Sequence, residues 1–194
     1  MANFVTLAEY KEAEGITNPK DDLRLNHIIP SITQLVKTYC GNSIIDYYDT
    51  EKVETFSVDW NTSLLQLTES PLVSVTSVEE RPDFSSSYET LTSSDYYVEI
   101  STDSIIRVSS TGQNMSWKKG PGSVRVTYTA GYQSCPADLK LAVMDLITYY
   151  LKDEHKERRN LGTASIQNQA SSSQRNNVAF PDHIKRVLDL YKNY

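Results

Sequence analysis

The sequence predicts an α+β fold, in which N-terminal and central helices pack with an antiparallel β unit and a tethered C-terminal helix follows. Apolar residues recur at helical spacing over residues 7–41 and 136–157. Between them, over residues 52–129, short runs of β-branched and aromatic residues alternate with turn-forming clusters. We therefore expect a main domain of residues 1–160, a flexible linker of residues 161–178 and a C-terminal docking helix of residues 179–194.

Two helices are predicted at the N-terminus. Thr6 and Glu9 have the spacing of a capping box, which favours a short helix over residues 7–14. A second, amphipathic helix is predicted over residues 18–41. Pro30 lies inside it and removes one backbone hydrogen bond, so we expect a kink or a division there.

The middle of the chain predicts an antiparallel β unit of five or six strands. The serine-rich segment 81–94 is typical of a protruding loop or hairpin, and Gly120-Pro121-Gly122 is expected to form a turn between strands. The predicted strands are Val53–Val58, Leu64–Leu67, Leu72–Val78, Tyr96–Ile100, Ile105–Val108 and Val124–Tyr128.

The sharpest boundary is the structural junction between the last strand and the central helix. Tyr128 and Tyr132 flank Gly131, which can take the positive φ that a sharp exit from a strand needs. Pro136 suits the first turn of a helix, because its missing N–H has no intrahelical partner there. A helix over residues 136–157 is therefore predicted.

Composition restricts the function. The formal net charge of −6 disfavours a protein that grips phosphates, since that grip depends on clustered Lys and Arg. No apolar run approaches the ~18 residues of a membrane span, and the N-terminus lacks a secretory pattern, so we expect folding in the cytoplasm and no membrane partner. Cys40 and Cys135 are too few and too isolated for a disulfide framework.

The sequence predicts no catalytic residue, no metal site and no cofactor. The three histidines lie in separate elements, and no nucleophile elbow or phosphate loop is present. Acid pairs such as Asp21-Asp22 and Glu79-Glu80 are typical of caps and surface charges. Lys118-Lys119 beside Trp117 has the residue types to touch a nucleic-acid backbone and stack a base, but a hairpin tip kept soluble by lysines is favoured.

Four stretches carry a family resemblance: residues 7–41, 67–75, 95–98 and 124–142, with the Tyr-x-Ala-Gly-Tyr element at 128–132 the sharpest. With these motifs the chain resembles the head-to-tail connector proteins of tailed bacteriophages, small adaptors that join the portal to the tail. The resemblance runs through about residue 150. The chain departs from the family pattern at Pro30 and in a long, polar segment 81–119.

The resemblance implies a structural protein of the virion, assembled in the host cytoplasm. Many copies would form a ring, commonly dodecameric, that extends the DNA exit channel under the portal, and DNA would pass through it without specific binding. Such a ring requires a heterologous interface, in which one face of each subunit meets a different face of the next.

Two sets of residues are expected to bind partners in such an assembly. The C-terminal helix is expected to dock on the portal or an adjacent subunit, although its apolar side is equally able to complete the core of its own subunit; its anchors are Phe180, Ile184, Leu188 and Tyr191. The loops expected to face the tail or stopper protein carry Phe84, Tyr88, Trp117, Lys118 and Lys119.

Two alternative hypotheses place the chain in other classes of protein. In one, the chain is an accessory module of a phage particle that binds carbohydrate or protein in a tyrosine-lined groove of the β unit. In the other, it is an enzyme that uses paired carboxylates of the β unit, although no spacing in the sequence demands such a site.

Overall fold

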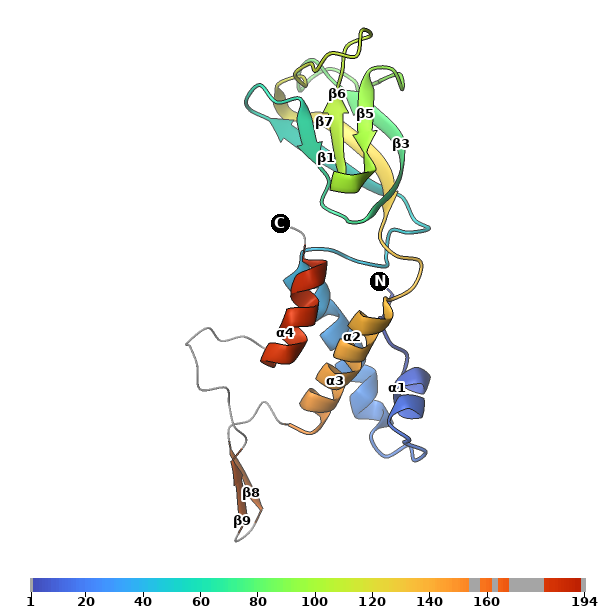
Figure 1. Ribbon diagram of the computed structural model, residues 1–194, viewed down its shortest axis with the longest axis vertical. Coiled ribbons are helices and arrows are strands. Elements are labelled where there is room, and N and C mark those ends of the chain that lie inside the picture. The colour runs from blue at the N-terminus through green and yellow to red at the C-terminus, as the bar shows by residue number, and fades with distance from the viewer. Residues whose placement is uncertain (1, 154–157, 162–163, 168–179, 193–194) are drawn as a thin grey trace. The chain divides into compact units, whose positions relative to one another are not determined.

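A computed structural model describes residues 2–153, 158–161, 164–167 and 180–192 (Figure 1). The chain divides into two compact units: a helical unit of Met1–Gly41 with Ser134–Lys192, and a β unit of Asn42–Gln133. The α+β class is therefore confirmed, with the α-helices in the helical unit and the two larger antiparallel sheets in the β unit. The structure differs from a main domain over 1–160, because the β unit is inserted between two helical segments.

The helical unit contains α1 (Leu7–Ala13), α2 (Asp22–Cys40), α3 (Ala137–Leu151) and α4 (Asp182–Leu188), which continues into a 3-10 turn, Asp189–Tyr191. The capping box of α1 is confirmed: the hydroxyl of Thr6 accepts from the backbone N–H of Glu9 at 3.2 Å, and the Glu9 carboxylate accepts from the N–H of Thr6 at 2.8 Å. Gly41 ends α2 in the left-handed region, with φ at 65°.

Pro30 does not divide α2, which runs unbroken from Asp22 to Cys40. The proline lies on the exposed side of the helix, where water can replace the missing backbone donor. At the next position, the hydroxyl of Ser31 donates to the carbonyl of His27 at 2.7 Å. Of the two predicted outcomes, a kink or a division, the division is wrong.

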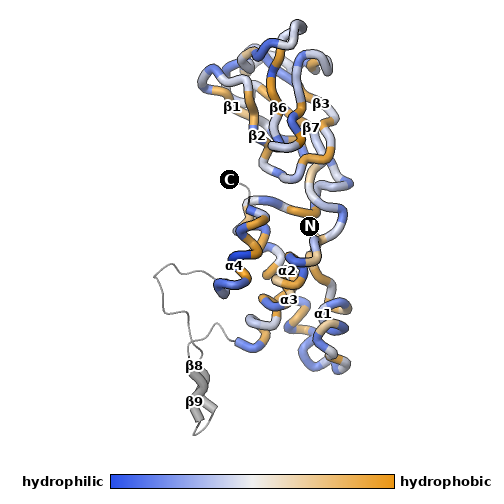
Figure 2. Tube along the Cα trace, viewed as in Figure 1, coloured by the Kyte–Doolittle hydropathy of each residue, from blue (hydrophilic) through white to orange (hydrophobic). Residues whose placement is uncertain are grey.

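The core of the helical unit lies where α2, α3 and α4 meet. Helix α4 contacts both α3 and α2, so three elements that are distant in sequence share one apolar interior. Apolar and polar residues alternate along these helices, as Figure 2 shows. The buried side chains include Leu25, Ile29, Ile32, Val36, Leu139, Val143, Leu146, Ile147, Ile184 and Leu188.

Helix α3 ends earlier than predicted, at Leu151 rather than near residue 157. Asp153 takes a positive φ of 55°, and its N–H donates to the carbonyl of Tyr150 at 3.2 Å. Arg24 from α2 donates to the Asp153 carboxylate at 2.8 Å. These contacts of Asp153 close the C-terminal end of α3.

The β unit contains two antiparallel sheets, ordered β1-β7-β3-β4 and β2-β6-β5. All six predicted runs are strands, and the structure adds the two-residue β4 inside the segment read as a loop or hairpin. The strands are β1 (Lys52–Val58), β2 (Leu64–Gln66), β3 (Leu72–Glu80), β4 (Glu89–Thr90), β5 (Tyr96–Glu99), β6 (Ser104–Arg107) and β7 (Gly120–Ala130).

Both sheets contribute to one core. Register places Val126 of β7 opposite Glu54 of β1 and Val78 of β3, so β7 is an inner strand of its sheet. The β2-β6-β5 sheet adds Leu65 and Ile105 to the same cluster. Further members are Val58, Leu67, Leu72, Trp117, Val124, Tyr128 and Ala130.

Gly120-Pro121-Gly122 is not a turn between strands but the start of β7. Val58 pairs with Gly120 and Phe56 with Val124, so the register shifts between these pairs. The glycines have φ values of 140° and 58°, which a strand tolerates at an irregularity of this kind. The prediction is corrected because glycine and proline mark bulges as well as turns.

Two further strands, β8 (Arg158–Leu161) and β9 (Ala164–Gln167), pair antiparallel. The structure thus differs from the predicted linker over residues 161 and 164–167, since backbone pairing needs no large apolar side chains. The rest of that linker, residues 162–163 and 168–178, lies outside the described residues.

Candidate interaction surfaces

Three of the four acids considered for catalysis, Asp22, Glu79 and Glu80, are engaged in ion pairs. Asp22 binds Lys11 at 2.7 Å, and Glu79 binds Arg125 at 2.5 Å. Glu80 is buried and accepts from Arg107 at 3.4 Å. Within the described part of the chain, no cluster of three or more His, Cys, Asp or Glu side chains is arranged to hold a metal ion. No helix of that part has the length and apolar content to cross a bilayer.

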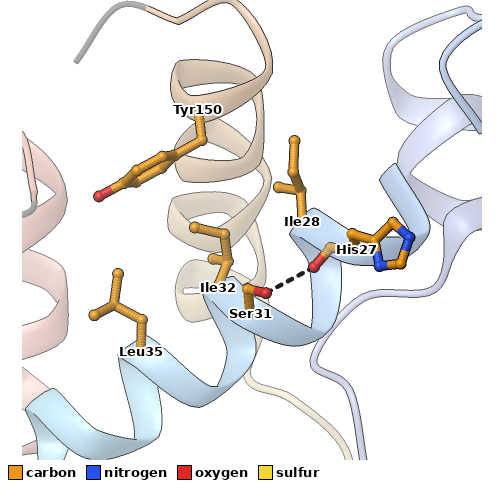
Figure 3. Close-up of a pocket in the computed structure, with 6 residues that line it drawn as sticks. All are labelled: His27, Ile28, Ser31, Ile32, Leu35 and Tyr150. Atoms are coloured by element: carbon orange, nitrogen blue, oxygen red, sulfur yellow. Dashed lines mark hydrogen bonds between the residues drawn. The ribbon is translucent and has the colours of Figure 1, made fainter. Parts of the chain in front are cut away.

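A groove of about 340 Å³ lies on the helical unit between α2 and α3 (Figure 3). Its walls are mainly apolar: Ile28, Ile32 and Leu35 from α2 face Tyr150 from α3. The Ser31 hydroxyl at its edge already donates to the carbonyl of His27. The groove therefore suits an apolar side chain of a partner better than a reaction.

The C-terminal helix covers its own helical unit. Phe180, Ile184 and Leu188 are buried, and the ring of Phe180 meets that of Tyr39 edge to face at 4.9 Å between centroids. The Tyr191 hydroxyl donates to Asp138 at the start of α3 at 2.6 Å, and this bond is the main cause of the lowered pKa of Asp138.

Of the two surfaces that the sequence allowed for this helix, the structure shows the one in the same subunit. A role for its anchors in binding the portal or a neighbour stays a prediction. The outward side of this segment presents Leu190, which is 76% exposed. That residue, rather than the buried anchors, is available to a partner while the helix stays in place.

Arg81 holds together the tip of the β unit, by which we mean residues 81–88 after β3 and residues 118–122 at the start of β7. Its guanidinium donates to the carbonyls of Gly122 at 2.8 Å, Pro121 at 2.9 Å and Phe84 at 3.1 Å. The same group lies over the rings of Phe84 and Tyr88, at 4.7 and 4.8 Å from their centroids. Arg81 thus fixes the loop after β3 to the first residues of β7.

The ring of Tyr88 lies against two guanidinium groups. Arg125 is 4.1 Å from its centroid, in addition to Arg81. The Tyr88 hydroxyl donates to the carbonyl of Gly122 at 2.6 Å. A hydrogen bond to Glu79 raises the pKa of Arg125, so this stack stays charged.

The predicted partner-facing residues of the β unit have different environments. Phe84 is 69% exposed at the tip, and Lys118 and Lys119 are exposed beside the start of β7. Trp117 is only 2% exposed, and its indole N–H donates to the carbonyl of Ser63 at 2.7 Å. Its assignment to a partner-facing loop is corrected, because a ring of this size completes the β core.

Sequence reasoning missed Arg81 and Arg125 as parts of this tip. Arg81 directly follows β3 and precedes Pro82, as the sole cation of a serine-rich segment, and that position is the signal available in the sequence. Its partners lie about forty residues away, so spacing alone does not reveal them.

The junction residues lie where the chain leaves the β unit. Tyr128 is buried, its hydroxyl donates to Glu54 at 2.6 Å, and burial raises its pKa, with the Glu54 bond adding to the effect. Gly131 has φ at 100°, and the N–H of Tyr132 donates to the carbonyl of Ile44 at 2.7 Å. Pro136 is the N-cap of α3, which begins one residue later than predicted.

Three solved structures contain chains similar to this one. A chain in the neck of an empty GTA particle computed with C6 symmetry superimposes with a TM-score of 0.60 and 14% identity, covering 98% of this chain and 90% of that one. A chain in the neck of a native GTA particle computed with C12 symmetry superimposes with a TM-score of 0.57 and 17% identity, covering 100% of this chain and 96% of that one.

The third chain, from the virion of a native gene transfer agent (GTA) particle, superimposes with a TM-score of 0.60 and 16% identity. The match covers 98% of this chain and 90% of that one. At such identities these likenesses establish the fold. No curated protein matches the chain. A model of the head completion protein family matches residues 3–194, which is nearly the full length. The chain therefore belongs to the head completion protein family.

Proposed function

We propose that this chain is a structural virion protein that completes the phage head and joins it to the tail. The observation that carries the proposal is the family match over residues 3–194. The fold shared with chains in GTA necks supports the same role. The ion pairs of Asp22, Glu79 and Glu80 give no reason to add a reaction to it.

The working form of the protein is a ring, which we place at twelve copies around the DNA exit channel. The supporting observation is that GTA necks containing this fold were computed with C6 and C12 symmetry. A ring needs two different complementary faces on each subunit. The groove between α2 and α3 is a candidate for one of them, since its apolar walls suit a side chain of the next copy.

The ring binds the portal on one side and the tail or stopper protein on the other. Exposed Phe84, Lys118 and Lys119 support a tail-side role for the β tip. The segment Phe180–Tyr191 serves the portal or the neighbouring subunit through its exposed outward side. The net charge of −6 favours a channel wall from which DNA slides without specific binding.

The test is a phage that lacks this chain. The proposal expects DNA-filled heads without tails, and joining restored when the purified chain is added to such heads. Normal tailed particles formed without the chain would contradict it. If those particles then fail to attach to a glycan, the chain is an accessory carbohydrate-binding module instead.

A further inference from the structure

We infer that Phe84 is a preorganised aromatic anchor, which the β unit inserts into an apolar, acid-rimmed pocket of a neighbouring protein, and that Arg81 is its positioning residue. This inference rests on the proposed function for one point, the identity of that neighbour as the tail-side protein of the neck. It names the residue on which that contact depends and the chemistry of the matching pocket.

The loop that carries Phe84 is held in one conformation. Arg81 binds the carbonyls of Phe84, Pro121 and Gly122. Asp83 accepts from the N–H groups of Ser85 at 2.9 Å and Ser86 at 3.0 Å, and from the Ser86 hydroxyl at 2.8 Å. These bonds, with that of the Ser86 hydroxyl first, lower the pKa of the Asp83 carboxyl, so the loop stays fixed at neutral pH.

The ring of Phe84 has no role in the core of the β unit. It is 69% exposed and its described ring contact is the Arg81 guanidinium beneath it. A single exposed apolar residue on a surface needs no explanation. A large ring on a loop whose backbone is locked from both sides is different, because the entropy that binding normally removes is already removed by folding.

The charges around the ring define the kind of pocket that it fits. Lys118 and Lys119 are exposed and lead directly into Gly120. Arg81 and Arg125 flank Tyr88 under the same tip. Asp83 beside the ring and Glu79, the partner of Arg125, offset two of these four cations, so the exposed lysines leave the tip net positive on a chain whose net charge is −6. A pocket with an apolar floor and carboxylates at its rim is complementary to such a surface.

The same contacts favour a protein over DNA as the partner. The Arg81 guanidinium is occupied by backbone carbonyls, and that of Arg125 by Glu79. Trp117, the ring that sequence reasoning offered for base stacking, is buried in the core. Neither a cluster of arginines directed at phosphates nor a stacking platform is thus presented by the described residues of the tip.

The surroundings of Gly122 show that Arg81 packs tightly against the start of β7. A Cβ at this position would lie 2.8 Å from the Arg81 guanidinium and 3.3 Å from the side chain of Thr55, and its φ is +58°. Any larger residue there would displace Arg81. The start of β7 is therefore shaped to receive the arginine.

The first experiment measures the joining of purified tails to tailless heads that already carry the ring. Phe84→Ala is expected to raise the tail concentration for half-maximal joining by about 10- to 30-fold, as for the loss of a central aromatic anchor. Leu23→Ala, at a position of α2 that is 81% exposed and belongs to none of the proposed surfaces, should leave it within about twofold. Joining by Phe84→Ala within twofold of the unchanged protein would overturn the inference.

A second experiment separates positioning from stability. Arg81→Met should weaken joining while tryptophan fluorescence confirms that the β unit is folded, and Arg81→Lys should not restore it, because lysine lacks the planar fork. In the Phe84→Ala background, Arg81→Met should have little further effect. Additive losses in the double variant would show that Arg81 acts through something other than the ring.

A third experiment identifies the partner. A photoreactive phenylalanine at position 84 in assembled particles should cross-link to a tail-side neck protein. Cross-links to DNA, to another copy of this chain, or to nothing would each overturn the inference. The proposed function fails separately, if heads carrying the unchanged protein do not join tails at all.

Discussion

At the scale of single residues, the exit from the β unit depends on a position that only glycine can occupy. Gly131 has φ at +100°, and a Cβ there would lie 2.3 Å from the carbonyl oxygen of Ile44. The N–H of Gly131 also donates to the carbonyl of Pro71 at 2.7 Å. Both strain and collision therefore oppose any side chain.

Gly131→Ala is expected to lower the free energy of unfolding of the β unit by roughly 3 kcal/mol or more, since the backbone must move. The control is Gly112→Ala, at φ +78° with nothing within 4 Å, which isolates the strain of about 1 kcal/mol. Both tryptophans, Trp60 and Trp117, belong to the β unit, so fluorescence in urea reports its unfolding. Equal losses of unfolding free energy in the two variants would contradict the claim that a Cβ at position 131 collides with the carbonyl of Ile44.

Glu9 gives the helical unit a dependence on pH. Its hydrogen bonds to Lys140 and then to Thr6 lower its pKa from 4.5 to about 2. Because the folded-state pKa is the lower one, the stabilisation is fully present above about pH 4.5 and is lost as the pH falls toward 2.

Glu9→Gln should therefore reduce stability at pH 6 and have a much smaller effect at pH 2, since most of the pH-linked stabilisation is lost once the pH reaches the folded-state pKa. Circular dichroism at 222 nm during urea unfolding measures this difference. Glu12→Gln, at an exposed position of the same helix, is the control. A Glu9→Gln effect that stays constant from pH 6 to pH 2 would refute the assignment.

At the scale of elements, the C-terminal helix is part of the helical core. Leu188→Ala should destabilise the helical unit by about 2–5 kcal/mol, because its buried side chain leaves a cavity. Leu190→Ala, two positions further along, should stay within about 0.5 kcal/mol. Circular dichroism at 222 nm during urea unfolding measures the stability of both variants. Equal stabilities would mean that α4 is not docked in solution.

Elements with a clear period were predictable, and those set by distant contacts were not. The six strand runs and the cap of α1 follow from local spacing alone. The two-residue β4 is too short to show a period, and the bulge at the start of β7 has the composition of a turn. The end of α3 depends on Arg24, which is more than a hundred residues away.

The tip of the β unit was only partly predictable for the same reason. Phe84 and Tyr88 stand out as aromatic rings in a polar segment. The role of Arg81 could not be predicted, because its hydrogen-bond acceptors are carbonyls of β7. The indole N–H of the buried Trp117 likewise donates to Ser63, fifty-four positions away. The β unit, Asn42–Gln133, is wider than the predicted 52–129, because the loops that enter and leave it carry no strand period.

At the scale of the whole molecule, the chain combines a helical unit that carries an apolar groove with a β unit that carries a rigid aromatic tip. A ring needs complementary faces on each subunit and a further face for each partner. Surfaces on separate units suit this division of tasks, because contacts at one unit leave the other free to bind.

The groove is a test of the ring itself. Ile28→Glu places a charge on its apolar wall at a half-buried position, so the subunit should fold while ring formation on heads falls by at least about tenfold. Asn26→Glu, at an exposed position of the same helix that does not line the groove, is the matched control. Rings that form normally with Ile28→Glu would assign the interface between copies to another surface.

The central claim is that this chain works as a ring between head and tail. The most direct measurement is electron microscopy of the chain mixed with the portal of its own phage, with particle mass measured in parallel. The account predicts a closed ring of twelve copies on the portal. Monomers that remain separate from the portal at every ratio would contradict it.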